Sequence, residues 1–291
     1  MKRILLVFIV TALLGYPDYV FAKEVSTPDM LLIPAGEFIM GNTEEVGRRG
    51  IDYGVDEIPM RKVAVEGFYI DKYEVSNAEY KKYMEYLFEN EIKLPYYEDI
   101  GIPVPEEWRY WRGGNIPTYY EGMGGYPVND VDWYMASEYC RWAGKRLPTE
   151  EEWEKAARGT DGRIYPWGNE RNDGYANTRE VRSLEQKSEI TTSVRGAFSK
   201  DVSPYGIYDM GGNVAEWTAS LYRPYPNSPV AEREVFKREL YVVRGGSYLI
   251  PSNESAYTTA RYYMKPTRMP RAADAWHGDG MVGFRCAQDA E

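Results

Sequence analysis

The chain is poor in the side chains that bind transition metals. It has 291 residues but only one histidine and two cysteines. This scarcity excludes a histidine-rich iron or zinc centre. The sequence also has no basic run, and its net charge is -10 at pH 7. An acidic chain of this kind is not expected to bind nucleic acid or an anionic membrane surface.

Long apolar stretches are also absent beyond the N-terminus. Lys2 and Arg3 precede an apolar run over 4–14, and small residues near Ala22 offer a cleavage site. This pattern predicts a signal peptide over 1–22 and an exported, periplasmic or secreted, chain that begins near Lys23. The alternative is a retained N-terminal anchor, although the run is short for a membrane span.

The two cysteines, Cys140 and Cys286, predict one disulfide, because exported proteins rarely keep a pair of thiols reduced. The alternative is two unpaired buried thiols. Closing so long a loop stabilises the folded state by roughly 5 kcal/mol in the chain-entropy model.

Periodicity predicts a few regular elements within one domain over 23–291. Apolar residues punctuated by glycine predict a strand over 31–41, and alternation predicts another over 62–70. Helices are expected to begin at Ser76 and at Thr149, where capping residues precede apolar positions.

Five phrases occur in an order that is typical of one family. They are IPAGEFIMG at 33–41, FYIDKYEVSN at 68–77, YCRWAGKRLPTEEEWE at 139–154, YGIYDMGGNVAEWT at 205–218, and RGGSYLI with GFRCA at 244–287. In these phrases the chain resembles the formylglycine-generating enzyme, or sulfatase-modifying factor, family. The resemblance implies a single α+β domain, a C-type-lectin-like variant with little regular secondary structure. It also implies the pairing of Cys140 with Cys286.

The family's reaction needs two further cysteines that this chain lacks. In the family's enzymes one cysteine follows the Gly-Gly-Ser-aromatic phrase two residues on, and the other stands five residues later. Here these positions hold Ile250 and Ser255. Copper(I) is a soft ion that prefers thiolate ligands, so no copper is expected.

One loop has the chemistry of a hard-cation site. Carboxylates at Asp209 and Glu216 flank two glycines that free the backbone to turn its carbonyls inward, and calcium prefers such oxygen ligands. The resemblance implies calcium ligands at Asp209, Gly212, Val214 and Glu216. The alternative is a turn capped by Asp209, with Glu216 in a surface ion pair.

The resemblance implies a second calcium site beginning at Asn177 and Thr178. Its acidic partner would fall within 185–189, where the match to the family is poor.

Three polar residues are candidates for residual chemistry: Ser247, Arg261 and His277. A lone histidine beside a carboxylate can act as a base. The alternatives are a structural hydroxyl at Ser247 and a solvated loop histidine at His277.

Aromatic residues crowd the region where the family's enzymes hold their substrate peptide: Tyr248, Tyr257, Tyr262, Tyr263 and Trp276. Such residues suit a face that recognises a peptide or glycan, although core packing is an alternative. We therefore expect an exported, calcium-binding accessory protein that engages a peptide or an exported protein partner. The alternative is a cysteine-independent oxidoreductase or maturation factor, similar to the family branch that matures pyoverdine. True formylglycine generation would require another nucleophile.

Overall fold

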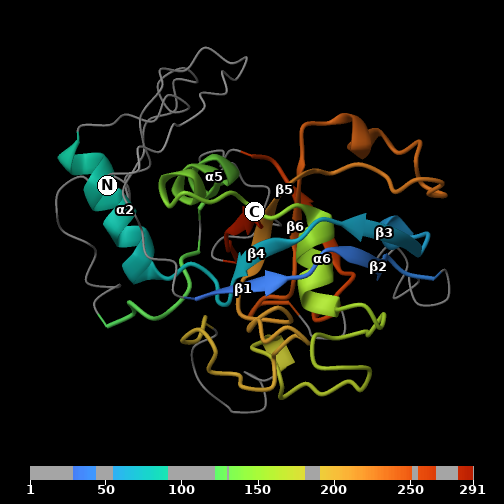
Figure 1. Cartoon of the computed structure of the whole chain (residues 1–291), viewed down its shortest axis with the longest axis horizontal. Helices are drawn as coiled ribbons and strands as arrows, with labels where there is room; N and C mark the ends of the chain where they lie inside the picture. Colours follow the sequence, from blue (N-terminus) through green and yellow to red (C-terminus); the bar gives the residue numbers. More distant parts are fainter. Residues whose placement is uncertain are drawn as a thin grey trace, which may run out of the picture.

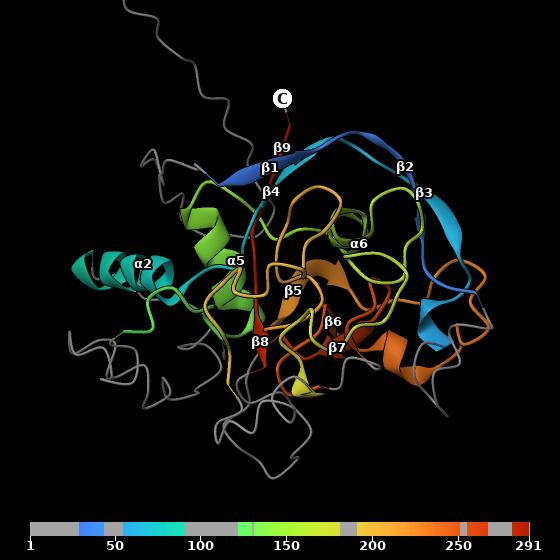
Figure 2. The same ribbon diagram turned by 90° about the horizontal axis from the view of Figure 1, so that it is seen from below.

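The N-terminal strands form a long antiparallel ribbon that curves along one side of the molecule (Figure 2). Strand β1 (Met30–Ile33) pairs with β4 (Phe68–Asp71), and β2 (Gly36–Met40) pairs with β3 (Arg61–Val65). Both expected strands are therefore present, but the prediction that each is continuous was wrong. Pro34 cannot donate to a ladder, and the two-residue insertion at 66–67 breaks the opposite strand.

The computed structural model describes residues 29–43, 55–90, 122–129, 131–180, 191–250, 255–266 and 281–290. The expected signal peptide over 1–22 lies outside these residues, as do Trp276 and His277. In the described part of the chain, no helix is long and apolar enough to cross a membrane.

A four-stranded sheet lies beneath the ribbon, with strand order β7-β6-β5-β8. Its strands are β5 (Ala215–Leu221), β6 (Tyr241–Arg244), β7 (Arg261–Met264) and β8 (Val282–Gly283). The β5–β8 pair is parallel and the other pairs are antiparallel. The last strand, β9 (Ala287–Asp289), leaves this sheet and pairs with β4 of the ribbon.

In the part of the chain that the structure describes, three α-helices pack against these sheets or against one another (Figure 1). They are α2 (Asn77–Glu89), α5 (Trp133–Trp142) and α6 (Glu150–Arg158), with short 3-10 turns η1 (Val55–Glu57) and η3 (Glu234–Lys237). Ser76 and Glu79 cap α2 reciprocally, and Thr149 and Glu152 cap α6 in the same way. Both predicted helix starts are confirmed.

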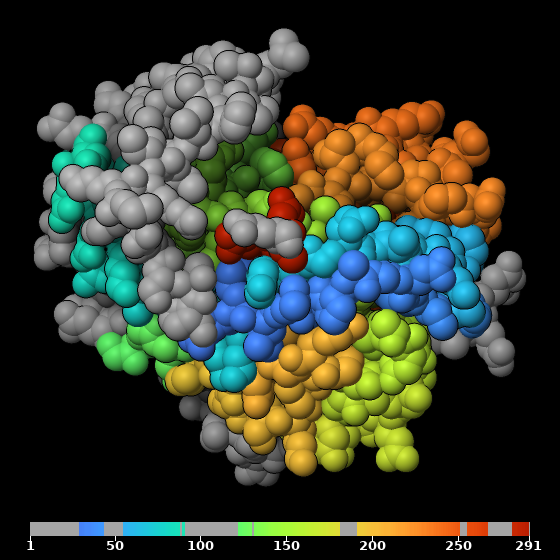
Figure 3. Space-filling view, viewed as in Figure 1, coloured from blue at the N-terminus to red at the C-terminus, as the bar shows by residue number. Residues whose placement is uncertain are grey.

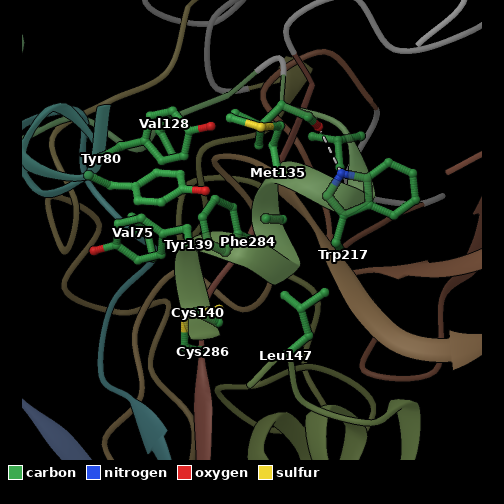
Figure 4. Packing of buried hydrophobic residues seen from close by; sticks show 14 of the residues in the cluster. Val75, Tyr80, Val128, Met135, Tyr139, Cys140, Leu147, Trp217, Phe284 and Cys286 are labelled. Atoms are coloured by element: carbon green, nitrogen blue, oxygen red, sulfur yellow. Dashed lines mark hydrogen bonds between the residues drawn. A yellow bond between two sulfur atoms is a disulfide. The ribbon is translucent and has the colours of Figure 1, made fainter. Parts of the chain in front are cut away.

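The largest hydrophobic core lies between α2, α5 and the four-stranded sheet, and it contains the disulfide (Figure 4). Cys140 and Cys286 are joined, with their Cα atoms 5.6 Å apart, so the predicted pairing is confirmed. Tyr80, Tyr139 and Phe284 pack edge to face or offset beside it.

A second core lies under α6, where Trp153 is fully buried against the ribbon. The space-filling view shows β1 to β3 as a blue belt across the surface, between the yellow-green and gold segments that follow α6 and the orange loop that follows β5 (Figure 3). Much of the described chain between the helices and strands is irregular, as expected of this α+β fold.

The candidate cation loop and the lost thiol positions

The loop over 209–216 turns sharply before it enters β5. Asp209 and Asn213 both adopt the left-handed backbone region, with φ of 61° and 72°. Asp and Asn tolerate this region better than most residues. Gly212 lies against another segment so closely that a Cβ would be 2.7 Å from Asn177 N. The loop is therefore packed directly on the segment that carries the second candidate site.

Asp209 is the clearest candidate for a cation ligand in the loop. Its side chain is buried, and Oδ2 accepts a 2.6 Å hydrogen bond from Gly196 N. Its Oδ1 is also buried and meets no hydrogen-bond donor within the described ranges. Burial raises the pKa of Asp209 to about 6. An unpaired buried carboxylate oxygen is costly, and a bound cation would remove that cost.

Glu216 has a different environment. Its Oε1 lies 2.6 Å from Arg285 Nη2, and its Oε2 accepts from Arg285 Nε at 2.7 Å and from Trp153 Nε1 at 2.8 Å. All three side chains are essentially inaccessible to solvent. The ion pair of Glu216 is therefore internal, and not the surface pair that the alternative interpretation expected.

Four buried carboxyl groups lie at the loop: Asp209 and Glu216 belong to it, Glu74 and Asp201 accept hydrogen bonds from its backbone, and Arg285 is a nearby cation. Burial raises the pKa of Glu74 and of Asp201 well above their ordinary values, and the charge on Asp209 raises both further. This excess of acidic groups favours a cation among them.

Nothing in the sequence pattern indicates that Glu74 belongs to this site. It lies in the phrase at 68–77, well over 100 positions from the loop, and its two oxygens accept from Asn213 Nδ2 and Val214 N at 2.8 and 3.1 Å. Only knowledge of the tertiary contact could have placed it there.

The second candidate site adjoins the first. Asn177 donates from Nδ2 to Asn213 Oδ1 at 3.0 Å and to Ser193 Oγ at 3.3 Å. Thr178 is fully buried, and its Oγ1 has no hydrogen-bond partner among the residues described here. The acidic partner expected within 185–189 lies outside the described residues.

The donors of the first loop fit calcium, which prefers hard oxygen ligands. Asp209 offers a free carboxylate oxygen, and Gly212 and Val214 offer backbone carbonyls. Glu216 could contribute only by sharing its oxygens with Arg285, since a carboxylate has about four lone-pair sites. Within the described ranges no three carboxylate, thiol or imidazole side chains form a metal cluster by themselves. A cation here would therefore depend on the backbone carbonyls.

The positions of the family's copper ligands follow strand β6. Ile250 is half-buried and Ser255 is fully buried. Ser247 is also fully buried, and its Oγ accepts from Leu249 N at 3.3 Å. Arg244 holds the backbone after Ser255 in place by donating to the carbonyl oxygens of three consecutive residues, Thr258, Thr259 and Ala260. The backbone that follows Ser255 is thus held by buried hydrogen bonds although the thiols are absent.

Arg261 is part of the interior. Its guanidinium forms a bidentate ion pair with Glu150 and donates to Asp56 O at 3.1 Å. It also lies over the ring of Tyr225, 4.3 Å from its centroid. These contacts occupy the group that the sequence suggested as a catalytic candidate.

The expected aromatic face is divided in the structure. Tyr248 is buried, and Tyr257 stacks on Tyr165 with centroids 5.1 Å apart. Tyr262 and Tyr263 are consecutive in β7 and so point to opposite faces of the sheet. Only Tyr263, which is 44% exposed, is strongly accessible among these four.

A family model of the sulfatase-modifying factor enzyme 1-like domain matches residues 17–290. The chain belongs to this family. The mouse protein named inactive C-alpha-formylglycine-generating enzyme 2 is 32% identical over 294 residues, covering 90% of this chain and 86% of that protein. Mouse formylglycine-generating enzyme is 31% identical over 306 residues, covering 92% and 77%.

Solved structures show the same fold. PvdO from Pseudomonas aeruginosa superimposes on this sulfatase-modifying factor domain with a TM-score of 0.59 and 24% identity, covering 90% of this chain and 94% of that one. The expected family and its α+β fold are thus confirmed, and this member has Ile250 and Ser255 where the resemblance implies two cysteines.

Proposed function

We propose that this member of the family is an exported, calcium-binding accessory protein that binds a peptide or protein partner and does not oxidise cysteine with copper. One observation carries the proposal. The sequence contains two cysteines, and Cys140 and Cys286 use both of them in a buried disulfide. No thiolate remains for copper(I), because Ile250 and Ser255 stand at the family's ligand positions.

The retained framework supports a binding role. Arg244, Arg261 and Arg285 are buried, and each is paired with a carboxylate or with backbone carbonyls. The fold is therefore held in shape without the thiol chemistry. The mouse relative whose name describes it as inactive supports the view that a complete domain of this family can exist without the reaction.

Calcium fits this role as a structural ion. Asp209 supplies an unpaired buried oxygen, and the surrounding carboxylates would be stabilised by a cation. A partner would be recognised on the accessible aromatic surface. Tyr263 packs on Tyr222 with ring centroids 4.4 Å apart and ring planes inclined by 32°, and part of its surface is exposed to solvent.

The oxidoreductase alternative gains less support. Arg261 is held in its ion pair with Glu150, Ser247 is inaccessible, and His277 lies outside the described residues. An enzyme site of this kind needs polar groups that converge on a reachable pocket.

The deciding experiment has two measurements on the purified mature protein. After dialysis against a chelator, calorimetric titration with calcium should show binding. Incubation of the protein with copper and a sulfatase-motif peptide should leave the peptide mass unchanged. Conversion of the peptide cysteine to formylglycine, or absence of calcium binding, would overturn the corresponding part of the proposal.

Native pull-down from the exported fraction, with calcium present, then searches for the partner. A stoichiometric partner whose binding is lost in Tyr263→Ala supports the accessory role.

A further inference from the structure

The expected carbonyl ligands of the cation loop belong to two peptide planes whose orientation is fixed by hydrogen bonds. In a trans peptide the N–H and C=O groups point in opposite directions, so the bond made by one sets the direction of the other. The N–H groups of both planes are bonded, Asn213 N to Asn177 O at 2.9 Å and Ala215 N to Met281 O at 2.9 Å. The carbonyls of Gly212 and Val214 are therefore directed away from those partners.

Between them lies a third peptide plane, and Glu74 holds it. Val214 N donates to Glu74 Oε1 at 3.1 Å, and Asn213 O accepts from Tyr248 N at 3.0 Å. This central plane links the two planes that carry the ligands. Any rotation of it would move both carbonyls.

Glu74 also anchors the side chain between the two carbonyls. Its Oε2 accepts from Asn213 Nδ2 at 2.8 Å, while Asn213 Oδ1 accepts from Ser193 N at 2.8 Å and from Asn177 Nδ2. Asn213 is thereby tied at both ends of its amide. These bonds hold its backbone in the left-handed region, which an unanchored residue would leave at a gain in free energy.

We infer that Glu74 is a positioning residue of the cation loop, which fixes the carbonyls of Gly212 and Val214 through Val214 N and the Asn213 amide. The inference rests on the proposed calcium site. Glu74 acts on the ion through the loop and is not itself counted among the ligands.

The test uses the full mature protein and two variants. Glu74→Gln keeps the size of the side chain but turns one acceptor into a donor, which opposes either Val214 N or Asn213 Nδ2. Asn213→Gly keeps the left-handed backbone accessible and removes the amide anchor. Calcium affinity is measured by calorimetry, and thermal unfolding is measured in calcium and in chelator.

Both variants are expected to weaken calcium binding by roughly 10–100-fold, as is usual when the groups supporting a metal ligand are lost. The difference in Tm between calcium and chelator should shrink accordingly. A matched control is Asp132→Asn, which alters another buried carboxyl that accepts a backbone N–H, at the start of α5 and with no hydrogen bond to residues 209–216 among those described. Its calcium affinity should equal that of the wild type.

The outcomes separate the two ideas. If the wild type binds no calcium, the proposed cation site fails and the positioning role fails with it. If the wild type binds calcium and a folded Glu74→Gln or Asn213→Gly variant binds it equally well, only the positioning role is refuted. A purely structural role for Glu74 would lower Tm equally in calcium and in chelator and leave the affinity unchanged.

Discussion

Arg285 and Glu216 form a fully buried bidentate ion pair, with Nη2 2.6 Å from Oε1 and Nε 2.7 Å from Oε2. The pair joins the end of the chain to the first residues of β5. Removing one partner of such a pair leaves an uncompensated charge in the interior.

Arg285→Met should therefore lower the free energy of unfolding by about 3–5 kcal/mol. Urea denaturation followed by far-UV circular dichroism measures the change. Lys237→Met is the control, because Lys237 forms only an exposed pair with Glu234 and should change stability by less than about 1 kcal/mol. Equal stability of the two variants would show that the buried pair contributes nothing beyond its packing.

Loss of the disulfide should be similarly costly. Cys140→Ala with Cys286→Ala removes a link across a sequence separation of 146 residues, and a loss of about 2–5 kcal/mol in unfolding free energy is expected. The unreduced, denatured wild type should show no thiol in a colorimetric assay, since both cysteines are bonded. Detection of free thiol in that assay would contradict the pairing.

Restoring the two missing thiols should restore copper(I) binding. Arg244 still holds the backbone that follows Ser255, so Ile250→Cys with Ser255→Cys places two soft ligands on a framework that this chain retains. Competition with a colorimetric copper(I) chelator measures the affinity. The wild type should not compete at all, and a wild type that competes as well as the double variant would refute the argument from the lost thiols.

The free energy of unfolding should fall at acid pH because Glu150 becomes protonated. Burial alone would raise the pKa of Glu150, but attraction to Arg261 and Arg244 outweighs burial and holds the pKa below its ordinary value. A lowered folded-state pKa means that the stabilisation is present above the ordinary value of 4.5 and is lost as pH falls through the folded-state pKa. Unfolding free energies of the wild type and Glu150→Gln, measured from about pH 3 to about pH 7, should converge as the pH falls. A constant difference across this range would contradict the assignment.

Asp71 should make the stability of the folded state depend on pH in the opposite direction to Glu150. Burial raises its pKa above the ordinary value, although Lys145, 2.6 Å away, opposes the shift. A raised carboxyl pKa favours folding at low pH, and this contribution disappears as pH rises through the folded-state value. The stability of Asp71→Asn relative to the wild type should therefore improve with rising pH, in the same titration series.

Local features could be predicted from the sequence, and distant pairings could not. The capping pairs at Ser76 and Thr149 need only residues three positions apart, so the helix starts were readable. The breaks in the strands expected over 31–41 and 62–70 were missed, because the apolar pattern continues past the point at which strand pairing stops, as it does at Pro34.

In the candidate cation site, too, the residues close in sequence were predicted and the distant ones were not. The acidic residues and glycines of the cation loop are adjacent in sequence, whereas Glu74 reaches the loop only through the fold. Arg261 was a candidate for a catalytic role because it stands among tyrosines in the sequence. Its ion-pair partner Glu150 lies 111 positions away, in the first turn of α6. A helix-start glutamate carries no sign that it also neutralises a buried arginine.

The disulfide also determines how the molecule would bear tension. A force applied to β9 passes from Cys286 through the disulfide to Cys140 in α5, and does not follow the chain between these two cysteines. The cation loop and the positions Ile250 and Ser255 both belong to that stretch of chain. A partner that pulled on the C-terminal strand would therefore strip β9 from β4 without stretching the chain of the loop, because the covalent path runs through the disulfide.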